Sequence, residues 1–357
     1  MSRFLSGSLS AMTSYTPGEQ PRDKKYIKLN TNESPYPPAD EVVSAVTGEQ
    51  IRDLRLYSDP VCTELKARIA SVYNVSSENV FVSNGSDEIL NFAFMAYAGG
   101  GAAYADITYG FYSVYAELYG AKSEIIPLLP DFTQDKAGYE ATRCFTVIAN
   151  PNAPTGIALS RDEIERIVSA SADRVVLVDE AYVDFGAESA VELISKYKNL
   201  LVVMTFSKSR SLAGARLGFA IADKEIIADL EKIKYSTNPY NVNRLTQLVG
   251  VKTIENNCYY LENCEKIKKT REFTYEKLVE LGFEVLPSKA NFLFAKSSDI
   301  GGEELYISLK ARGILVRHFS ADRIKDFNRI TIGTDEEMQI FIETVRKILE
   351  EKRCERQ

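Results

Sequence analysis

The chain has 357 residues, of which 45% are hydrophobic and 26% are charged, with a formal net charge of −7. This length predicts two domains or one large α/β domain, and the acidic balance argues against a nucleic-acid partner, which needs a basic surface. No stretch is apolar and long enough for a signal peptide or a membrane span, so we expect a cytoplasmic protein with no membrane partner.

Cysteine and histidine usage narrows the possible chemistry. The five cysteines are scattered without a CxxC pair, which favours a reducing compartment over a disulfide framework. The single histidine, His318, ends an apolar run and leaves little to build a zinc site or an imidazole-based triad. We therefore expect no metal, and acid–base chemistry that relies on lysine, carboxylate or a cofactor.

Seven short apolar runs alternate with helical patterns in the first two thirds of the chain. Between two of them, Ser160 followed by Glu163 predicts a capping box at the start of a helix. Near-continuous Val, Ile and Leu strands separated by helices predict a doubly wound α/β domain with a mainly parallel sheet. The predicted strands are 80–83, 102–107, 123–128, 144–149, 174–179, 200–206 and 216–222.

The pattern changes after residue 243. Residues 256–282 predict a long amphipathic helix, and shorter strands and a C-terminal helix follow, which is typical of an α+β unit. We predict an N-terminal arm (1–40) shared with the small domain, a large domain (41–244) and a small C-terminal domain (245–357).

Polar residues follow several predicted strands, at the edge where ligands bind in open parallel sheets. Gly85, Ser86 and Asp87 open a helix, which is either an anion site or a plain N-cap. The other strand ends bring Asn152 in a turn, a carboxylate with a phenol (Asp179, Tyr182), and a lysine with hydroxyls (Thr205, Ser207, Lys208).

This set of groups matches the needs of pyridoxal 5′-phosphate. The aldehyde needs an amine, the ring nitrogen a carboxylate, the ring oxygen donors, and the phosphate N–H groups, hydroxyls and an arginine. A P-loop and a GxGxxG dinucleotide motif are both missing from the sequence.

The chain resembles the fold-type I, aspartate-aminotransferase-like pyridoxal-phosphate enzymes, and within them the histidinol-phosphate aminotransferases. The likeness spans nearly the whole chain, and the order of its motifs is more specific than any one of them. These are "KLNTNESPYPP", "LRLYSDP", "SNGSDE", "ITYGFY", "NPNAPTG", "VDEAY", "TFSKSRSLAGARLGF", "GILVR" and "RITIGT".

The resemblance implies that Lys208, Asp179 and Tyr182 form the catalytic centre. Lys208 would form a Schiff base with the cofactor and move the substrate proton, while Asp179 pairs with the ring nitrogen. Asn152 and Tyr182 would donate to the ring oxygen. Tyr109 would stack on the ring, and the phosphate would be surrounded by Gly85, Ser86, Asp87, Thr205, Ser207 and Arg216. Tyr57 would reach that phosphate from the other subunit, which implies a homodimer.

The resemblance also implies the substrates. Tyr15, Asn32, Arg317 and Arg329 would bind a phosphorylated amino donor, L-histidinol phosphate, with 2-oxoglutarate as the amino acceptor. Without the resemblance, a surface ion pair is the preferred interpretation of each of these two arginines. Two enzymatic alternatives share the cofactor site: an aromatic amino-acid aminotransferase and a threonine-phosphate decarboxylase. A binding or regulatory module is disfavoured by Lys208 and by the lack of an extra domain.

Several positions depart from the family pattern. Ser34 and Pro37 stand where asparagine and glycine are common, Ile107 replaces a proline-led segment, and Ala153 stands where asparagine is frequent. Arg210, with Ser211 beside it, occupies a place usually held by an aromatic residue. These departures leave the substrate more open than the cofactor, and the sequence suggests no role for Arg210.

Overall fold

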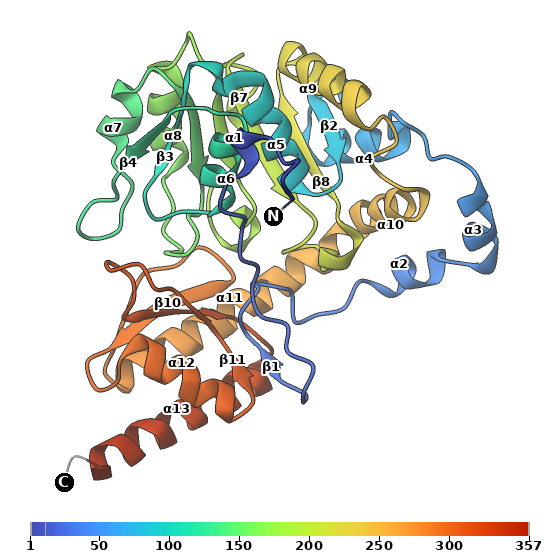
Figure 1. Ribbon diagram of the computed structural model, residues 1–357. Coiled ribbons are helices and arrows are strands. Elements are labelled where there is room, and N and C mark those ends of the chain that lie inside the picture. The colour runs from blue at the N-terminus through green and yellow to red at the C-terminus, as the bar shows by residue number, and fades with distance from the viewer. Residues whose placement is uncertain (1, 11, 356–357) are drawn as a thin grey trace.

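A seven-stranded sheet forms the centre of the larger of two bodies in the computed structural model, which describes residues 2–10 and 12–355 (Figure 1). Its strand order is β2-β8-β7-β6-β5-β3-β4, and only β8 runs antiparallel to its neighbours. The predicted mainly parallel sheet is thereby confirmed. The strands are β2 (Val80–Ser83), β3 (Ala102–Ala105), β4 (Ser123–Ile126), β5 (Phe145–Ala149), β6 (Val176–Asp179), β7 (Leu200–Thr205) and β8 (Gly218–Ala222).

Helices cover both faces of this sheet because successive side chains of each buried strand point to opposite sides. On β7, Leu201 and Val203 pack into one hydrophobic core, whereas Leu200 and Val202 pack into the other. The first core is completed by α5 (Ser86–Tyr97), α6 (Phe111–Leu118) and α9 (Lys224–Thr237). The second is completed by α4 (Thr63–Tyr73), α8 (Arg161–Ser169) and α10 (Arg244–Glu255), with α7 (Lys136–Ala141) packed against α8.

The predicted capping box at the start of α8 is present. The backbone N–H of Glu163 donates to the Ser160 hydroxyl at 3.3 Å, and the Ser160 N–H donates to the Glu163 carboxylate at 2.9 Å. Two backbone donors that the helix leaves without partners are thus satisfied.

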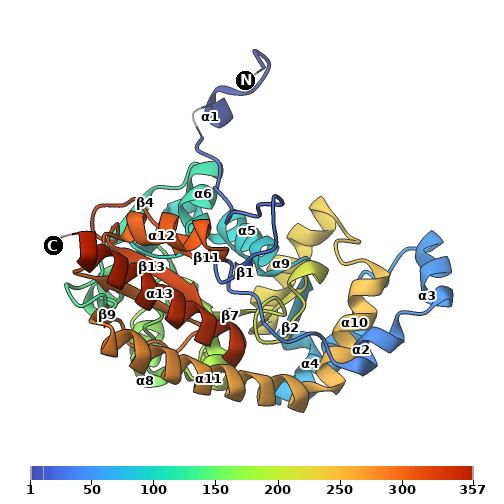
Figure 2. The ribbon, with the colours of Figure 1, turned by 90° about the horizontal axis from the view of Figure 1, so that it is seen from below.

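The smaller body packs a four-stranded antiparallel sheet against three helices. The sheet order is β12 (Arg317–His318), β13 (Phe327–Thr331), β10 (Phe292–Ser297) and β9 (Phe283–Val285). The helices are α11 (Asn257–Glu280), α12 (Gly302–Ala311) and α13 (Asp335–Glu355). The long α11 runs from the neighbourhood of α10 along the small body and so connects the two (Figures 1 and 2).

The N-terminal segment joins the smaller body and borders the larger one. β1 (Ile27–Lys28) pairs in parallel with β11 (Ile314–Leu315), so the residues that follow these two strands emerge at the same edge. α1 (Gly7–Ser10) projects away from the rest of the molecule in Figure 2, and α2 (Asp40–Ala45) and α3 (Gly48–Arg52) extend to one side (Figures 1 and 2).

The predicted domain boundaries at residues 40 and 244 stay a prediction; α10, just beyond the second, packs against α4 and α2. Short 3₁₀ turns occupy Asp53–Arg55, Ser77–Asn79, Ala98–Gly100, Val183–Phe185, Ala190–Leu193 and Ala213–Ala215. Within the described ranges, every helix is too short or too polar to cross a membrane.

Candidate active site

A cavity of about 790 Å³ lies between the two bodies, at the carboxyl ends of β5, β6 and β7. This is the edge at which ligands bind in open parallel sheets. The predicted site residues that line it are Tyr15, Asn32, Ser86, Asp87, Tyr109, Asp179, Tyr182, Thr205, Ser207, Lys208, Arg216, Arg317 and Arg329. Gly85, Asn152 and Tyr57 do not line it.

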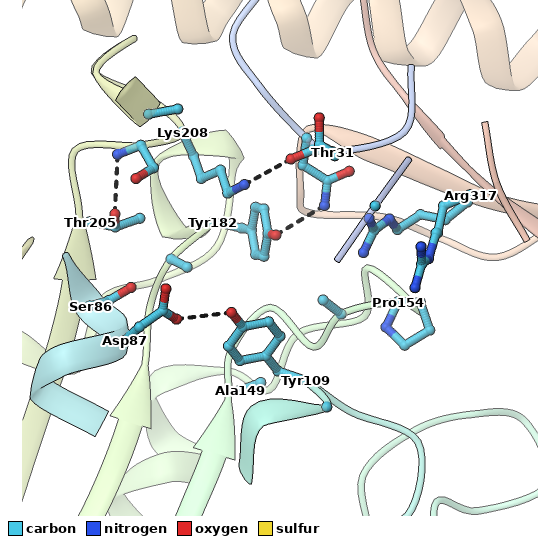
Figure 3. Close-up of a pocket in the computed structure, with 18 of the residues that line it drawn as sticks. Thr31, Ser86, Asp87, Tyr109, Ala149, Pro154, Tyr182, Thr205, Lys208 and Arg317 are labelled. Atoms are coloured by element: carbon cyan, nitrogen blue, oxygen red, sulfur yellow. Dashed lines mark hydrogen bonds between the residues drawn. The ribbon is translucent and has the colours of Figure 1, made fainter. Parts of the chain in front are cut away.

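Lys208 enters the cavity from the loop that follows β7. Its Nζ donates to the backbone carbonyl of Thr31 at 2.9 Å and lies 5.8 Å from the centre of the Tyr182 ring (Figure 3). Within the described part of the chain, no carboxylate forms an ion pair with this amine. A neutral carbonyl therefore holds the amine in place, and an incoming group can displace it.

Asp179 lies at the end of β6 with its carboxylate buried. The Tyr112 hydroxyl donates to Oδ2 at 2.8 Å, and the Ala181 N–H donates to Oδ1 at 3.2 Å. Burial raises the pKa of Asp179 to about 6, although the Tyr112 hydrogen bond opposes this rise. A cationic N–H group at this carboxylate would be strongly favoured, because it would restore the ionised form. Sequence reasoning missed Tyr112, which follows Tyr109 by three residues at the start of α6.

Tyr182 is fixed by its ring and by its hydroxyl. The ring stands perpendicular to Phe292, with their centres 5.1 Å apart. Its hydroxyl accepts a hydrogen bond from the side-chain amide of Asn32 at 2.9 Å (Figure 3). Asn32 thus contacts Tyr182 directly, a link that the sequence did not suggest; its substrate-binding role stays a prediction.

The start of α5 borders one end of the cavity. Gly85 caps the helix with φ +82°, and a Cβ there would lie 2.8 Å from Nη2 of Arg216. Similarly, a Cβ at Gly218 would lie 2.4 Å from the Ser86 nitrogen. Glycine at both positions therefore lets three chain segments meet where the helix presents unpaired N–H groups and a positive dipole.

At this end of the cavity, Asp87 is the carboxylate partner of Arg216. It pairs with Arg216 at 2.9 Å and accepts a hydrogen bond from the Tyr109 hydroxyl at 2.9 Å (Figure 3). Nearby, the Thr205 hydroxyl accepts the Ser207 N–H at 3.1 Å. Hydroxyls, amides and a guanidinium thus converge on one side of the cavity.

Asn152 is not brought to the cavity, so the structure gives no support to its predicted contact with the ring oxygen. Its amide donates to the carbonyl of Ile107 at 2.9 Å and to Thr155 at 3.2 Å, while Thr108 donates to its oxygen at 2.8 Å. One amide hydrogen thus goes to the Ile107 segment and the other to Thr155 within the turn, and the apolar Ala153 lines the cavity beside it.

Tyr57 also lies away from the cavity. Its side chain stacks on Tyr240 with ring centres 4.4 Å apart and remains 79% exposed. Its predicted contact with the cofactor phosphate of another subunit stays a prediction.

Arg317 and Arg329 bring two positive charges into the cavity. Arg317 donates to the carbonyls of Thr16 and Pro17 at 3.3 Å each, and Arg329 donates to the carbonyl of Asn30 at 3.0 Å. Neither pairs with a carboxylate among the residues that the structure describes. Burial lowers the pKa of Arg329, and the nearby charge of Arg317 acts in the same direction. This end of the cavity therefore favours an anion that carries two charges.

Comparison with known proteins gives consistent matches over nearly the full length. The family model described as "Aminotransferase class I and II" matches residues 24–345. The chain is 52% identical to a histidinol-phosphate aminotransferase of Brachyspira hyodysenteriae, over 98% of this chain and 99% of the relative. It is 51% identical to one of a Marinomonas species, over 95% and 97%. The histidinol-phosphate aminotransferase of Sinorhizobium meliloti, solved with pyridoxal 5′-phosphate, shares the fold at a TM-score of 0.88 and 20% identity, over 98% and 99%.

Proposed function

The chain belongs to the class I and II aminotransferase family, and we propose that it is a pyridoxal-phosphate-dependent histidinol-phosphate aminotransferase. It transfers the amino group of L-histidinol phosphate to 2-oxoglutarate and yields imidazole-acetol phosphate and L-glutamate. Two histidinol-phosphate aminotransferases that are 52% and 51% identical to the chain, over 98% and 95% of its length, support this reaction. The structural observation that carries it is the pair of cavity arginines, Arg317 and Arg329, neither of which pairs with a carboxylate among the residues that the structure describes.

The residues of the cavity fit the cofactor at both of its ends. Gly85 and Gly218 leave room beside the N-terminus of α5, where Arg216 and the hydroxyls of Thr205 and Ser207 would hold the phosphate. Asp179 would hold the protonated ring nitrogen, because a cation there offsets the burial of its carboxylate. When bound, the cofactor supplies a reactive aldehyde and a ring that accepts the electron pair released at the substrate carbon.

Lys208 and Tyr182 supply the protein's proton chemistry. The Lys208 amine, which the Thr31 carbonyl holds inside the cavity, is assigned to take the proton from the substrate carbon that carries the amino group and to return a proton later in the transfer. The Tyr182 hydroxyl would donate to the ring oxygen of the bound cofactor. Tyr109, held by Asp87, would pack against the ring face.

The substrate phosphate would bind at Arg317 and Arg329, since a dianion balances both guanidinium groups. An aromatic amino acid offers one carboxylate and leaves one of these charges uncompensated. Tyr15 lies at the same end; its ring stacks on Phe111 at 4.3 Å, and burial raises its pKa so that the phenol stays a hydrogen-bond donor. The cavity therefore favours the phosphorylated donor.

The substrate assignment is tested by offering four amino donors with 2-oxoglutarate: histidinol phosphate, phenylalanine, tyrosine and threonine phosphate. We expect glutamate from histidinol phosphate with the highest kcat/KM, and a loss of about tenfold or more in Arg329→Lys, which cannot form the fork-shaped contact. Lys208→Ala should lose turnover. A higher kcat/KM for an aromatic amino acid, or carbon dioxide released from threonine phosphate, would contradict the proposal.

We further propose a homodimer in which Tyr57 of each protomer reaches the cofactor phosphate of the other. Several exposed apolar side chains lie near Tyr57 in the sequence, in and after the projecting α2 and α3, as a buried interface requires: Val43, Val46, Ile51, Leu54, Leu56 and Val61. Lys208→Ala and Tyr57→Ala proteins can be denatured together and refolded as hybrids. Each hybrid then contains one intact site, so activity should exceed that of either parent refolded alone. Activity no higher than the parents' sum would refute the shared site.

A further inference from the structure

Thr331, the last residue of β13, begins a chain of hydrogen bonds that ends at the proposed catalytic tyrosine. Its hydroxyl donates to Oδ1 of Asn32 at 2.8 Å and accepts the backbone N–H of Asn32 at 3.0 Å. The Asn32 amide then donates to the Tyr182 hydroxyl at 2.9 Å. Thr331 and Asn32 are 2% and 1% exposed, so water does not compete for these bonds.

The direction of each bond follows from its neighbours. The Thr331 oxygen already accepts the Asn32 backbone N–H, so its only hydrogen goes to the Asn32 side-chain oxygen. This fixes the amide with its NH₂ group toward Tyr182. Because the Tyr182 oxygen accepts a hydrogen from Asn32, its own hydrogen must point elsewhere, and the tyrosine lines the cavity.

Asn32 is held in this orientation by its backbone as well. It adopts φ +56°, a left-handed conformation that asparagine tolerates better than most residues. The Asn291 side chain donates to its carbonyl at 3.0 Å and secures the turn. The Tyr182 ring is fixed by its packing against Ala153, Ala290 and Phe292. The bond from Asn32 therefore sets only the direction in which the Tyr182 O–H hydrogen points.

We propose that Asn32 and Thr331 are positioning residues that aim the Tyr182 proton into the cavity, where it binds the ring oxygen of the cofactor. The inference rests on the proposed cofactor. It assigns to Asn32 a role other than substrate contact, and to Thr331 a role that the sequence did not suggest. The turn at 150–156 adds weight to it, because Ala153 offers no donor there and Asn152 is turned away.

The test is Thr331→Val, which keeps the side-chain shape and removes the hydroxyl, with Thr331→Ser as the matched control and Thr331→Ala as a second deletion. Two readouts need no substrate: the dissociation constant of pyridoxal phosphate for the apoprotein, and the pH midpoint of the visible absorption of the bound cofactor. We expect Thr331→Val to raise the dissociation constant about threefold to tenfold, the worth of one neutral hydrogen bond. The midpoint should move upward by roughly half a unit, and Thr331→Ser should restore both.

A double-variant comparison separates positioning from simple stabilisation. In a Tyr182→Phe background, Thr331→Val should change neither readout, since its effect passes through the tyrosine hydroxyl. Equal shifts in both backgrounds would overturn the proposal, as would a loss of folding stability with both readouts unchanged. Failure of the wild-type protein to bind pyridoxal phosphate at all would instead refute the proposed function, and a different amino donor would leave this inference standing.

Discussion

Two arginines in the loop after β7 form the same kind of pair in opposite surroundings. Arg210 pairs with Asp184 at 2.8 Å, and their side chains are 3% and 19% exposed. Arg216 pairs with Asp87 at 2.9 Å, and theirs are 48% and 33% exposed. The contrast shows that an ion pair's burial, rather than its length, decides whether it holds a structure together or stands ready to change partners.

The buried pair gives Arg210 the role that its sequence position did not suggest. Nη1 of Arg210 faces Asp184, and Nη2 donates to the Tyr73 hydroxyl at 3.1 Å and to the Asn257 side chain at 3.2 Å. Arg210 follows Lys208 by two residues, and Asp184 follows Tyr182 by two residues. The Arg210–Asp184 pair and the bond to Asn257 therefore link three segments: the loop that carries Lys208, the 3₁₀ turn that follows Tyr182, and the first residue of α11.

The exposed pair is open on the cavity side. Arg216 lies among the residues that line the cavity, and Asp87 shares its carboxylate with the Tyr109 hydroxyl. A phosphate bound at the start of α5 would compete with Asp87 for the guanidinium. An exposed ion pair is weak in water, so Arg216 could exchange Asp87 for the phosphate proposed to bind here.

The largest effect should come from breaking the buried pair. Arg210→Met leaves the Asp184 carboxylate, which is only 19% exposed, without its guanidinium partner, which costs about 3 to 5 kcal/mol of unfolding free energy. Urea unfolding of the apoprotein at neutral pH measures this. The double variant Arg210→Met, Asp184→Leu removes both charges and should recover most of the loss; a double variant as unstable as the single one would show that packing, and not the charge, matters here.

At the exposed pair we expect a smaller effect on stability and a separate effect on cofactor affinity. Arg216→Met should change the unfolding free energy by less than about 1 kcal/mol, because a surface pair contributes little. It should weaken pyridoxal phosphate binding by roughly tenfold to a hundredfold, the worth of a hydrogen bond to a charged group. Spectroscopic titration of the apoprotein gives the affinity. Unchanged affinity together with a large loss of stability would reverse the contrast between the two arginines.

The sheet and the cavity edge could be predicted from the sequence because both rest on local patterns. Buried strands are continuous apolar runs, and the residues just after them must meet at one edge of a parallel sheet. Lys208, Asp179 and Tyr182 were found in this way, and the structure brings them to one cavity.

Contacts that depend on side-chain direction within a turn could not be predicted. Asn152 and Ala153 are neighbours, and the turn between β5 and α8 buries the amide while it exposes the methyl group to the cavity. The pairing of Arg210 with Asp184 and the contact of Asn32 with Tyr182 could not be predicted either. In each case the two residues are far apart in the sequence, and only the tertiary fold brings them together.

The parallel pairing of β1 with β11 also sets an order in time. Asn32 lies near the start of the chain, and its partner Thr331 lies 299 positions later. A ribosome adding roughly 5 to 20 residues per second releases the large sheet well before β11 and β13. The N-terminal segment must therefore wait, unpaired, until synthesis is nearly finished. The proposed positioning of Tyr182 by Thr331 therefore depends on residues made near the end of synthesis.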